Sequence, residues 1–351
     1  MRGGFLIYGA NGYTGALIAR EAARRGLAPI LAGRSAEPLV ALANQLALPY
    51  EVVALEDRAR LVTLLEKVGV VIHAAGPFSR TSRPMVDACL AARTHYLDIT
   101  GEIPVFEACF TRSEEAKQAG VMLLPGSGFD VVPSDCLAAH LKHRFPGATR
   151  LALGFQAGGR PSRGTATTML ENVPKGGVVR RGGVLTPVPA AYKTRVIDFG
   201  RGPTGAVTIP WGDVSTAYHT TAIPDIEFYM AAPFATRVAI RATRYLGPAL
   251  GSAGIQRFLK RRIDAGPPGP DEKARARHEN LLWGEASDST GTTFVSRMRT
   301  PEGYDLTVLS SLAIAARVLG GEAPTGFQTP ARAYGKDFAL AVPGVTRQDL
   351  A

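Results

Sequence analysis

The sequence predicts an α/β protein in which a doubly wound parallel sheet is followed by a second, α+β domain built on a mixed sheet. Over roughly the first 125 residues, short β-rich runs alternate with helical stretches, as in parallel sheets with crossover helices. A glycine-rich turn directly follows the first of these runs. After about residue 150 the chain becomes rich in Gly, Pro and Thr, and the alternation ends. Because 351 residues exceed what one simple core needs, two domains are expected.

The first domain is expected to cover residues 1–130. Its predicted strands are residues 5–10, 29–32, 50–54, 70–74, 95–98 and 121–125. Its predicted helices are residues 14–25, 37–46, 59–68, 84–92 and 105–118. Crossovers in this order are typical of a doubly wound sheet, which binds ligands at the carboxyl ends of its strands.

The second domain, for substrate binding and dimerisation, is expected to cover residues 131–319. Its predicted strands are residues 150–156, 193–199, 205–210, 217–221 and 226–230, followed by a hairpin of residues 281–287 and 292–298. Its predicted helices are residues 136–145, 166–171, 234–246 and 306–319. The tail, residues 320–351, is expected to pack back on the first domain.

The composition is that of a globular protein, with 46% hydrophobic and 20% charged residues. The net charge of +10 comes from dispersed basic residues, mostly Arg, without interleaved aromatics, so no nucleic-acid partner is expected. A positive field also suits a phosphate-rich cofactor or an anionic acyl carrier. Neither a signal peptide nor an apolar run long enough for a membrane span is found, so a cytoplasmic protein is expected.

Cysteine and histidine spacing predicts no metal site. Cys89, Cys109 and Cys136 are far apart and are interpreted as small buried hydrophobic residues. His140 and His143 lie three residues apart on a predicted helix, but no carboxylate or cysteine joins them in the sequence.

The glycine-rich turn predicts a dinucleotide site, because it follows a strand and opens a helix. Gly9 would allow the tight turn, Gly12 the approach of backbone N–H groups to a pyrophosphate, and Gly15 the packing of the helix on the sheet. The helix N-terminus would then receive the phosphates. The full set of predicted contacts in this turn is Gly9, Asn11, Gly12, Tyr13, Thr14 and Gly15.

The end of the second strand predicts NADP rather than NAD. NAD sites place an acid there to hold the ribose 2′-hydroxyl, whereas this chain has Arg34 and Ser35. A guanidinium and a hydroxyl group are suitable donors to a 2′-phosphate.

The loop after the fourth strand is expected to pass the cofactor ribose and nicotinamide. Its predicted contacts are Ala75, Gly76, Pro77 and Phe78. His73, on the strand before this loop, is interpreted as a hydrogen-bonded core residue.

Five motifs together resemble the saccharopine dehydrogenase-like oxidoreductases, in particular the branch that includes trans-acting enoyl reductases. They are Gly9–Gly15, Ala32–Ser35, Tyr96–Glu102, Gly128–Asp135, and Gly164–Thr165 before a helix. The resemblance implies an NADP-binding Rossmann domain and a second α/β domain that closes over the nicotinamide. The chain is much shorter than true saccharopine reductases, which argues against saccharopine itself as the substrate.

Catalytic candidates follow the fifth and sixth strands. The polar residues there are Asp98, Thr100, Glu102, Asp130, Ser134 and Asp135. Structural roles are the alternative: Asp98 and Asp130 as acceptors of backbone N–H groups in turns, and Ser134 and Asp135 as helix caps. We predict Asp130 and Glu102 as catalytic candidates, with capping favoured for Ser134 and Asp135.

In the second domain, Arg160, Arg163 and Thr165 precede a helix and are predicted to bind an anionic substrate group. His219, with Tyr218 on a predicted strand, is a further candidate proton donor, although a lone strand histidine is usually structural.

Three functions are compatible with these residues. The first is NADPH-dependent reduction of an unsaturated or carbonyl acyl-type substrate. Its support is the low charge of residues 202–226 and their surroundings, where Trp211, Tyr218, Phe228 and Tyr229 would line an apolar pocket or form a core. The second is reduction of an imine formed from an amino acid, for which Arg160, Arg163, Arg180 and Arg181 would have to converge on a polycarboxylate. The third is a non-catalytic NADP-binding sensor or partner protein. A homodimer is an additional expectation.

Overall fold

The computed structural model describes residues 3–350, without the side chains of residues 246–249, and divides the chain into two units. The first unit contains the chain up to Val132 together with Tyr304–Ala333. The second contains Pro133–Gly303 and the residues from Tyr334 on. Among the residues described, no helix is both long and apolar enough to cross a membrane.

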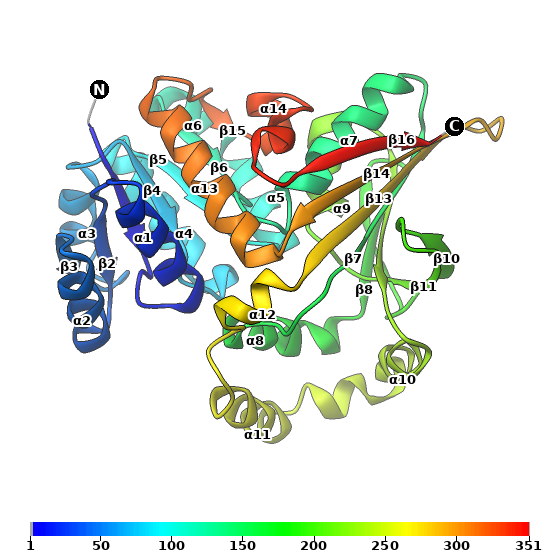
Figure 1. Cartoon of the computed structure of the whole chain (residues 1–351), viewed down its shortest axis with the longest axis horizontal. Coiled ribbons are helices and arrows are strands. Elements are labelled where there is room, and N and C mark those ends of the chain that lie inside the picture. Colours follow the sequence, from blue (N-terminus) through cyan, green and yellow to red (C-terminus); the bar gives the residue numbers. More distant parts are fainter. Residues whose placement is uncertain (1–2, 351) are drawn as a thin grey trace. The chain divides into compact units, whose positions relative to one another are not determined.

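The first unit is built on a parallel sheet with the strand order β15-β6-β5-β4-β1-β2-β3. The strands are β1 (Phe5–Tyr8), β2 (Ile30–Gly33), β3 (Tyr50–Val52), β4 (Val70–His73), β5 (His95–Asp98), β6 (Met122–Leu124) and β15 (Gly326–Phe327). The helices are α1 (Tyr13–Arg24), α2 (Ala36–Leu46), α3 (Arg58–Leu65), α4 (Phe78–Ala92), α5 (Ile103–Thr111), α6 (Ser113–Ala119) and α13 (Gly303–Leu319). Figure 1 shows these strands flanked by the helices.

The strand order reverses between β1 and β4. After β1 the chain adds β2 and β3 on one side, then returns to pair β4 with the other side of β1. The loops that leave β1 and β4 therefore diverge at the carboxyl edge of the sheet, where doubly wound folds bind their ligands.

The predicted strands and helices of the first domain are confirmed, with ends that differ by a few residues. Two helices differ more. The helix predicted from Pro84 begins at Phe78, so that Pro84 lies inside it, and the helix predicted over residues 105–118 is divided into α5 and α6. The doubly wound parallel sheet is thus the observed fold.

The second unit is built on a mixed sheet with the main order β10-β11-β12-β7-β13-β14-β16, and a β8–β9 hairpin joins it through β12. The strands are β7 (Arg150–Gln156), β8 (Gly177–Arg181), β9 (Val184–Val188), β10 (Thr194–Asp198), β11 (Pro203–Thr208), β12 (Asp225–Ala231), β13 (Glu279–Ser287), β14 (Thr293–Pro301) and β16 (Thr346–Leu350). The helices are α7 (Val132–Arg144), α8 (Arg163–Asn172), α9 (Asp213–Thr221), α10 (Phe234–Leu250), α11 (Ala253–Asp264) and α12 (Glu272–Ala276). Helix α14 (Pro330–Tyr334) belongs to the first unit except for Tyr334, and α7 and α13 also have one end residue in the other unit. Short 3₁₀ helices, η1 and η2, cover Val173–Lys175 and Phe338–Ala341.

The strand predicted over residues 217–221 is wrong. These residues form the end of α9, whose inward face buries Val214, Ala217 and Thr221. The positions 214, 217 and 221 follow the helical repeat, whereas the short run that was interpreted as β-type was too brief to separate the two periodicities. His219 therefore lies in the last turn of a helix.

Two chain segments also lie in a different unit from the predicted one. The helix of residues 306–319 was expected in the second domain but belongs to the first unit. Ser310 donates a hydrogen bond to the backbone oxygen of Ser127, which fastens this helix to the loop after β6. The tail, residues 320–351, was expected to pack back on the first domain. Its residues up to Ala333 belong to the first unit, where β15 pairs with β6. The residues from Tyr334 on belong to the second unit, where β16 pairs antiparallel with β14.

Candidate functional site

The turn after β1 requires glycine at Gly9 for two reasons. Its φ of +82° lies in the left-handed region, and a Cβ on Gly9 would stand 2.8 Å from the backbone nitrogen of Ala75. Its N–H donates a 2.8 Å hydrogen bond to the oxygen of Ala32 on β2. The turn is thereby held against the ends of both neighbouring strands.

Gly12 and Gly15 shape the start of α1. A Cβ on Gly15 would lie 2.2 Å from the oxygen of Gly9, so only glycine permits this closeness of helix and turn. Gly12 is the exposed N-cap residue, which has no side chain to cap the helix, and the first turn contains no acid. The amide groups at this helix end are therefore suited to an anion such as a pyrophosphate. Asn11 is exposed beside them, and a Cβ on Gly33 would stand 2.9 Å from Asn11 Oδ1.

Tyr13 and Thr14 open α1 and are half-buried. The Tyr13 ring meets the ring of Tyr304 edge-on, with 5.0 Å between the ring centroids. Tyr304 comes from the far end of the sequence, and its place beside the glycine turn was not predicted.

Arg34 and Ser35 lie exposed at the end of β2, where Ser35 is the N-cap residue of α2. Within the described part of the chain, no ion pair engages Arg34. The first acid of this segment is Glu37, inside the first turn of α2. A guanidinium that is exposed and has no carboxylate partner is available to a 2′-phosphate.

The loop after β4 contains a cis peptide bond between Gly76 and Pro77. The Thr81 hydroxyl donates to the oxygen of Ala75 at 2.6 Å, and Pro77 is the N-cap residue of α4. The side chain of Thr81 therefore holds the loop from inside the helix that follows it.

His73 is fully buried beneath this loop, with its Nε2 3.1 Å from Thr81 Oγ1. Because the Thr81 hydroxyl already donates to Ala75, Nε2 carries the proton and Nδ1 is left as a buried acceptor without a partner. Burial lowers the pKa of His73 to about 3. The interpretation as a hydrogen-bonded core histidine is confirmed.

Glu102 is joined to the same loop. Its carboxylate accepts the backbone N–H groups of Phe78 at 2.8 Å and Ser79 at 3.1 Å, the first two residues of α4. The backbone N–H of Glu102 donates to Thr100 Oγ1 at 3.0 Å. In this arrangement Glu102 acts as a capping acceptor that positions the β4 loop.

Asp98 links the ends of β5 and β6. It accepts hydrogen bonds from the Tyr96 hydroxyl at 2.6 Å and from the backbone N–H groups of Thr100 at 3.0 Å and Gly126 at 2.8 Å. Burial raises the pKa of Asp98 to about 6, against the effect of these donors. The structural interpretation of Asp98 as an acceptor in turns is confirmed.

Asp130 differs from Asp98 because no backbone N–H donates to its carboxylate within the described residues. It follows β6, keeps some solvent exposure, and faces Gly101, where a Cβ would stand 2.7 Å from Asp130 Oδ2. Desolvation raises the pKa of Asp130 to about 7. The site thus holds a carboxyl group that is partly protonated near neutral pH.

The loop that presents Asp130 is held by hydroxyl groups of α13. Thr307 Oγ1 accepts the backbone N–H of Phe129 at 3.0 Å, and Ser311 Oγ lies 2.9 Å from Ser127 Oγ. This contribution of α13 was not predicted. The signal available was the group of hydroxyl residues at positions 307, 310 and 311 in an otherwise apolar helix.

Ser134 and Asp135 do not sit at the predicted helix start, because α7 begins at Val132. The Ser134 hydroxyl donates to Asp213 Oδ2 at 2.8 Å, and Thr220 donates to Asp135. Both side chains connect α7 with α9, so the capping prediction is replaced by a helix-to-helix contact.

The predicted anion site at α8 is partly occupied by the protein itself. Ser162 caps the helix by accepting the N–H of Thr165 at 3.2 Å. The Arg163 guanidinium donates to the oxygen of Gly266, and its backbone N–H donates to the oxygen of Pro268. Arg163 therefore fastens the Gly- and Pro-rich loop, and Arg160 is the exposed cation at this helix end.

The predicted apolar pocket residues form a core in the second unit. Phe228 is fully buried, stacks on Trp211 with 5.6 Å between centroids, and contacts Phe155. Tyr229 is buried, with its hydroxyl on Glu227. The core alternative therefore holds for Phe228 and Tyr229, while Tyr218 lies under the Arg180 guanidinium at 4.2 Å.

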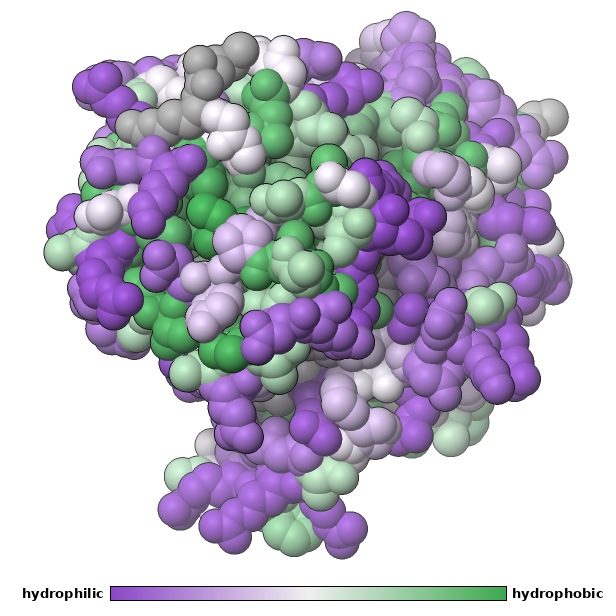
Figure 2. All heavy atoms as spheres, turned by 60° about the vertical axis from the view of Figure 1, so that its left-hand side comes forward, coloured by the Kyte–Doolittle hydropathy of each residue, from purple (hydrophilic) through white to green (hydrophobic). Residues whose placement is uncertain are grey.

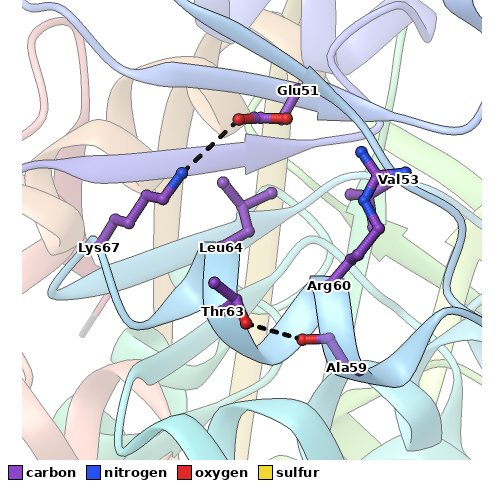
Figure 3. A pocket seen from close by; sticks show the side chains of 7 residues that line it. All are labelled: Glu51, Val53, Ala59, Arg60, Thr63, Leu64 and Lys67. Carbon is purple, nitrogen blue, oxygen red and sulfur yellow. Dashed lines mark hydrogen bonds and ion pairs between the residues drawn. The ribbon is translucent and has the colours of Figure 1, made fainter.

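One surface hollow in the first unit has a volume of about 240 Å³ and lies between β3 and α3 (Figure 3). An ion pair of 3.6 Å between Lys67 and Glu51 crosses it. None of the predicted site residues lines this hollow, so it is separate from the candidate cofactor site. No group of three or more potential metal ligands occurs among the described residues.

Comparison with known proteins bears on the first unit most directly. Residues 5–124 match the family model of the saccharopine dehydrogenase NADP binding domain. A putative trans-acting enoyl reductase of Mycobacterium tuberculosis is 33% identical over 183 residues, which cover 47% of this chain and 43% of that protein. A saccharopine dehydrogenase-like oxidoreductase of Bos taurus is 26% identical over 170 residues, covering 43% of this chain and 40% of that protein. The matched region thus spans less than half of these relatives.

Among solved structures, apo saccharopine dehydrogenase (L-Glu forming) from Saccharomyces cerevisiae superposes with a TM-score of 0.67 at 12% identity, over 99% of this chain and 100% of that one. This similarity shows a shared fold. The uncapped start of α1 and the exposed Arg34 fit a dinucleotide with a 2′-phosphate, in agreement with the matched domain. Residues 5–124 therefore match the saccharopine dehydrogenase NADP binding domain, a match that indicates NADP as the cofactor, and the resemblance of this region to the saccharopine dehydrogenase-like oxidoreductases is confirmed.

Proposed function

We propose that this protein is an NADPH-dependent reductase of an unsaturated or carbonyl acyl-type substrate, with Asp130 as the proton donor. The observation that carries the proposal is the state of Asp130. Its carboxyl group lies after β6, has a pKa raised to about 7, and receives no hydrogen bond from the described residues. A group with these properties can give up a proton near neutral pH.

Reduction of a conjugated C=C or C=O bond adds a hydride to one atom and a proton to the other. NADPH would supply the hydride when bound. Asp130 would supply the proton and regain it from solvent, to which it is partly exposed. Glu102 would orient the β4 loop through the N–H groups of Phe78 and Ser79. The glycine turn and Arg34 would bind the pyrophosphate and the 2′-phosphate.

Acyl-type substrates are favoured over polycarboxylate imines by the state of the arginines. A polycarboxylate product needs several free cations. Arg163 and Arg180 are each engaged by backbone oxygens, and Arg181 is hydrogen-bonded to Tyr192. Imine reduction of the saccharopine type is therefore the second candidate. The relatives named trans-acting enoyl reductases lend independent support to the first.

The test is NADPH oxidation, followed by absorbance at about 340 nm. One panel of substrates contains enoyl and ketoacyl thioesters, and the other contains keto acid and amine pairs. Turnover of thioesters that is lost in Asp130→Asn supports the proposal. Turnover of keto acid and amine pairs alone would favour the imine reductase. Tight NADPH binding without turnover of either panel would favour the non-catalytic sensor. His219 remains a predicted proton-donor candidate, and Arg160 and Thr165 remain predicted substrate-binding residues. The homodimer and the cytoplasmic location remain predictions.

A further inference from the structure

Helix α10 of the second unit has two of its arginines, Arg237 and Arg244, on its inner side and three large apolar side chains on its outer side. Arg244 donates to the backbone oxygens of Ala190 and Ala191. The Arg237 guanidinium lies against Gly205, on which a Cβ would be only 2.3 Å from Nη1. On the opposite side, the exposed fractions of Phe234, Val238 and Tyr245 are 74%, 50% and 83%.

These three apolar residues form one stripe, because positions 234, 238 and 245 differ by four and seven residues and so lie on one helix face. Single exposed apolar residues are ordinary on protein surfaces, but a continuous stripe indicates an interaction surface. Because Arg237 and Arg244 hold the inner face of α10 against this unit, the outer, apolar face is not the one that packs on the core of the unit.

Helix α11 extends the apolar surface. Ile255 and Phe258 are exposed by 37% and 58%, and the Arg262 guanidinium lies 5.6 Å from the centroid of the Phe258 ring. The opposite face is held by Gln256, whose side-chain amide donates to the backbone oxygens of Leu250 and Leu170. We call the exposed faces of these two helices the α10–α11 surface, defined by Phe234, Val238, Arg241, Tyr245, Ile255, Arg257, Phe258, Lys260, Arg261 and Arg262. Both helices lie at the lower margin of Figure 1, and Figure 2 shows hydrophilic and hydrophobic residues side by side in this lowest part.

The charge of this segment has one sign. Residues 234–264 contain seven Lys or Arg residues and a single acid, Asp264. Of the seven, Arg241, Arg257, Lys260, Arg261 and Arg262 are exposed. Exposed aromatic and aliphatic side chains among cations are typical of helices that lie in the interface of an anionic bilayer.

We infer that the α10–α11 surface binds the surface of a membrane that contains anionic lipids. The apolar side chains would enter the boundary between headgroups and acyl chains, while the cations contact lipid phosphates. Tyr245 and Phe258 have the size and chemistry of residues that settle at this depth. A second copy of the chain fits the same surface poorly, because a symmetric contact would place each cation cluster against its own copy.

The test is co-sedimentation of the full-length protein with vesicles of phosphatidylcholine alone and of phosphatidylcholine with about 30% phosphatidylglycerol. We expect binding to the second composition only, with an affinity that falls as salt is raised. Phe234→Ser/Phe258→Ser and Arg257→Glu/Arg261→Glu should each weaken binding about tenfold or more, because both the apolar and the ionic contributions are required.

Matched control variants separate membrane binding by the α10–α11 surface from general charge attraction. Val184→Ser/Val196→Ser changes two other exposed apolar residues, and Arg20→Glu/Arg60→Glu lowers the net charge equally at two exposed arginines of the first unit. Both control variants should bind as the wild type does. Equal loss in the control and test charge variants, or no loss in the Ser variant of α10 and α11, would overturn the inference.

A labelling experiment reports the insertion itself. The three native cysteines are buried, so Tyr245→Cys can be labelled selectively with an environment-sensitive dye. Its fluorescence should rise on anionic vesicles, whereas dye on Val196→Cys should not respond. No response at position 245, or a response caused by protein concentration without vesicles, would contradict membrane binding and indicate a protein contact instead.

Discussion

The Glu102 carboxylate accepts the backbone N–H of Phe78 at 2.8 Å, which ties the loop after β5 to the first residue of α4. A second bond, from Ser79 N–H at 3.1 Å, completes the cap of this helix. Since α4 begins directly after the cis Gly76–Pro77 bond, Glu102 controls the position of the loop that is proposed to contact the cofactor. These two hydrogen bonds make Glu102 a positioning residue.

Glu102→Ala should therefore destabilise the fold by about 1–2 kcal/mol through loss of the cap. NADPH affinity should fall as well, whereas Glu102→Gln, which keeps one acceptor oxygen, should restore most of both. Denaturant unfolding and a fluorescence titration with NADPH measure the two effects. Full stability and affinity in the Ala variant would show that the cap does not position the loop.

Gly15→Ala should abolish cofactor binding. The added Cβ would meet the oxygen of Gly9 at 2.2 Å, and the nearest atoms, of Gly9 and Ala10, are backbone atoms that cannot move aside as a flexible side chain could. Gly3→Ala is the control, because nothing lies within 4 Å of a Cβ there. The thermal shift caused by NADPH should vanish in the first variant and persist in the second; an unchanged shift in Gly15→Ala would refute the proposed packing.

Arg34→Ala should weaken NADPH binding by about 10- to 100-fold, as expected for loss of a charge-assisted hydrogen bond to phosphate. NADH has no 2′-phosphate, so its affinity should hardly change. Titrations of both nucleotides at low and moderate salt test this. An equal loss for both nucleotides would contradict the assignment of Arg34 to the 2′-phosphate.

Asp130→Asn should lower kcat by about 10²- to 10⁴-fold if Asp130 is the proton donor. Wild-type activity should decline as pH rises through about 7, the raised pKa of this group. The pKa of an unfolded Asp is near 3.8, so the folded state loses stability as pH rises from 3.8 towards 7. The Asn variant avoids this loss of stability, and at about pH 8 it should be more stable than the wild type by about 1–4 kcal/mol. A variant that is less stable at this pH would show that the carboxylate is stabilised by contacts of its own.

His73 predicts acid sensitivity. Its pKa falls from 6.5 in the unfolded chain to about 3 in the fold, so the folded state binds fewer protons and stability is lost as pH falls below 6.5. Relative to His73→Gln, the wild type should lose about 2–3 kcal/mol between neutral pH and pH ~4.5. Unfolding curves of both proteins at the two pH values give this difference, in which shared titrations cancel. A constant difference would mean that His73 is not buried as a neutral ring.

Local patterns were sufficient for residues 5–124 of the first unit. Their alternating runs specify a parallel sheet. In the β1 turn, Gly9 has a positive φ and Gly15 leaves no room for a Cβ, which makes the spacing of these glycines informative. The absence of an acid after β2 is likewise a property of one short segment. Residues 217–221 show the limit, since so short a run did not distinguish a strand from the end of α9.

By itself, the sequence determined the glycine-rich turn, the preference for NADP and the resemblance of the first domain to a known family, because each depends on short motifs of neighbouring residues. Only the tertiary structure separated Asp98 from Asp130. Both are acids after parallel strands, but Asp98 receives backbone N–H groups from two loops whereas Asp130 faces Gly101 without such donors. The tertiary structure also placed Thr307 and Ser311 beside residues 127–129, about 180 positions earlier in the chain. Desolvation and hydrogen bonding are set by groups that folding brings together across long loops, and no local pattern records them.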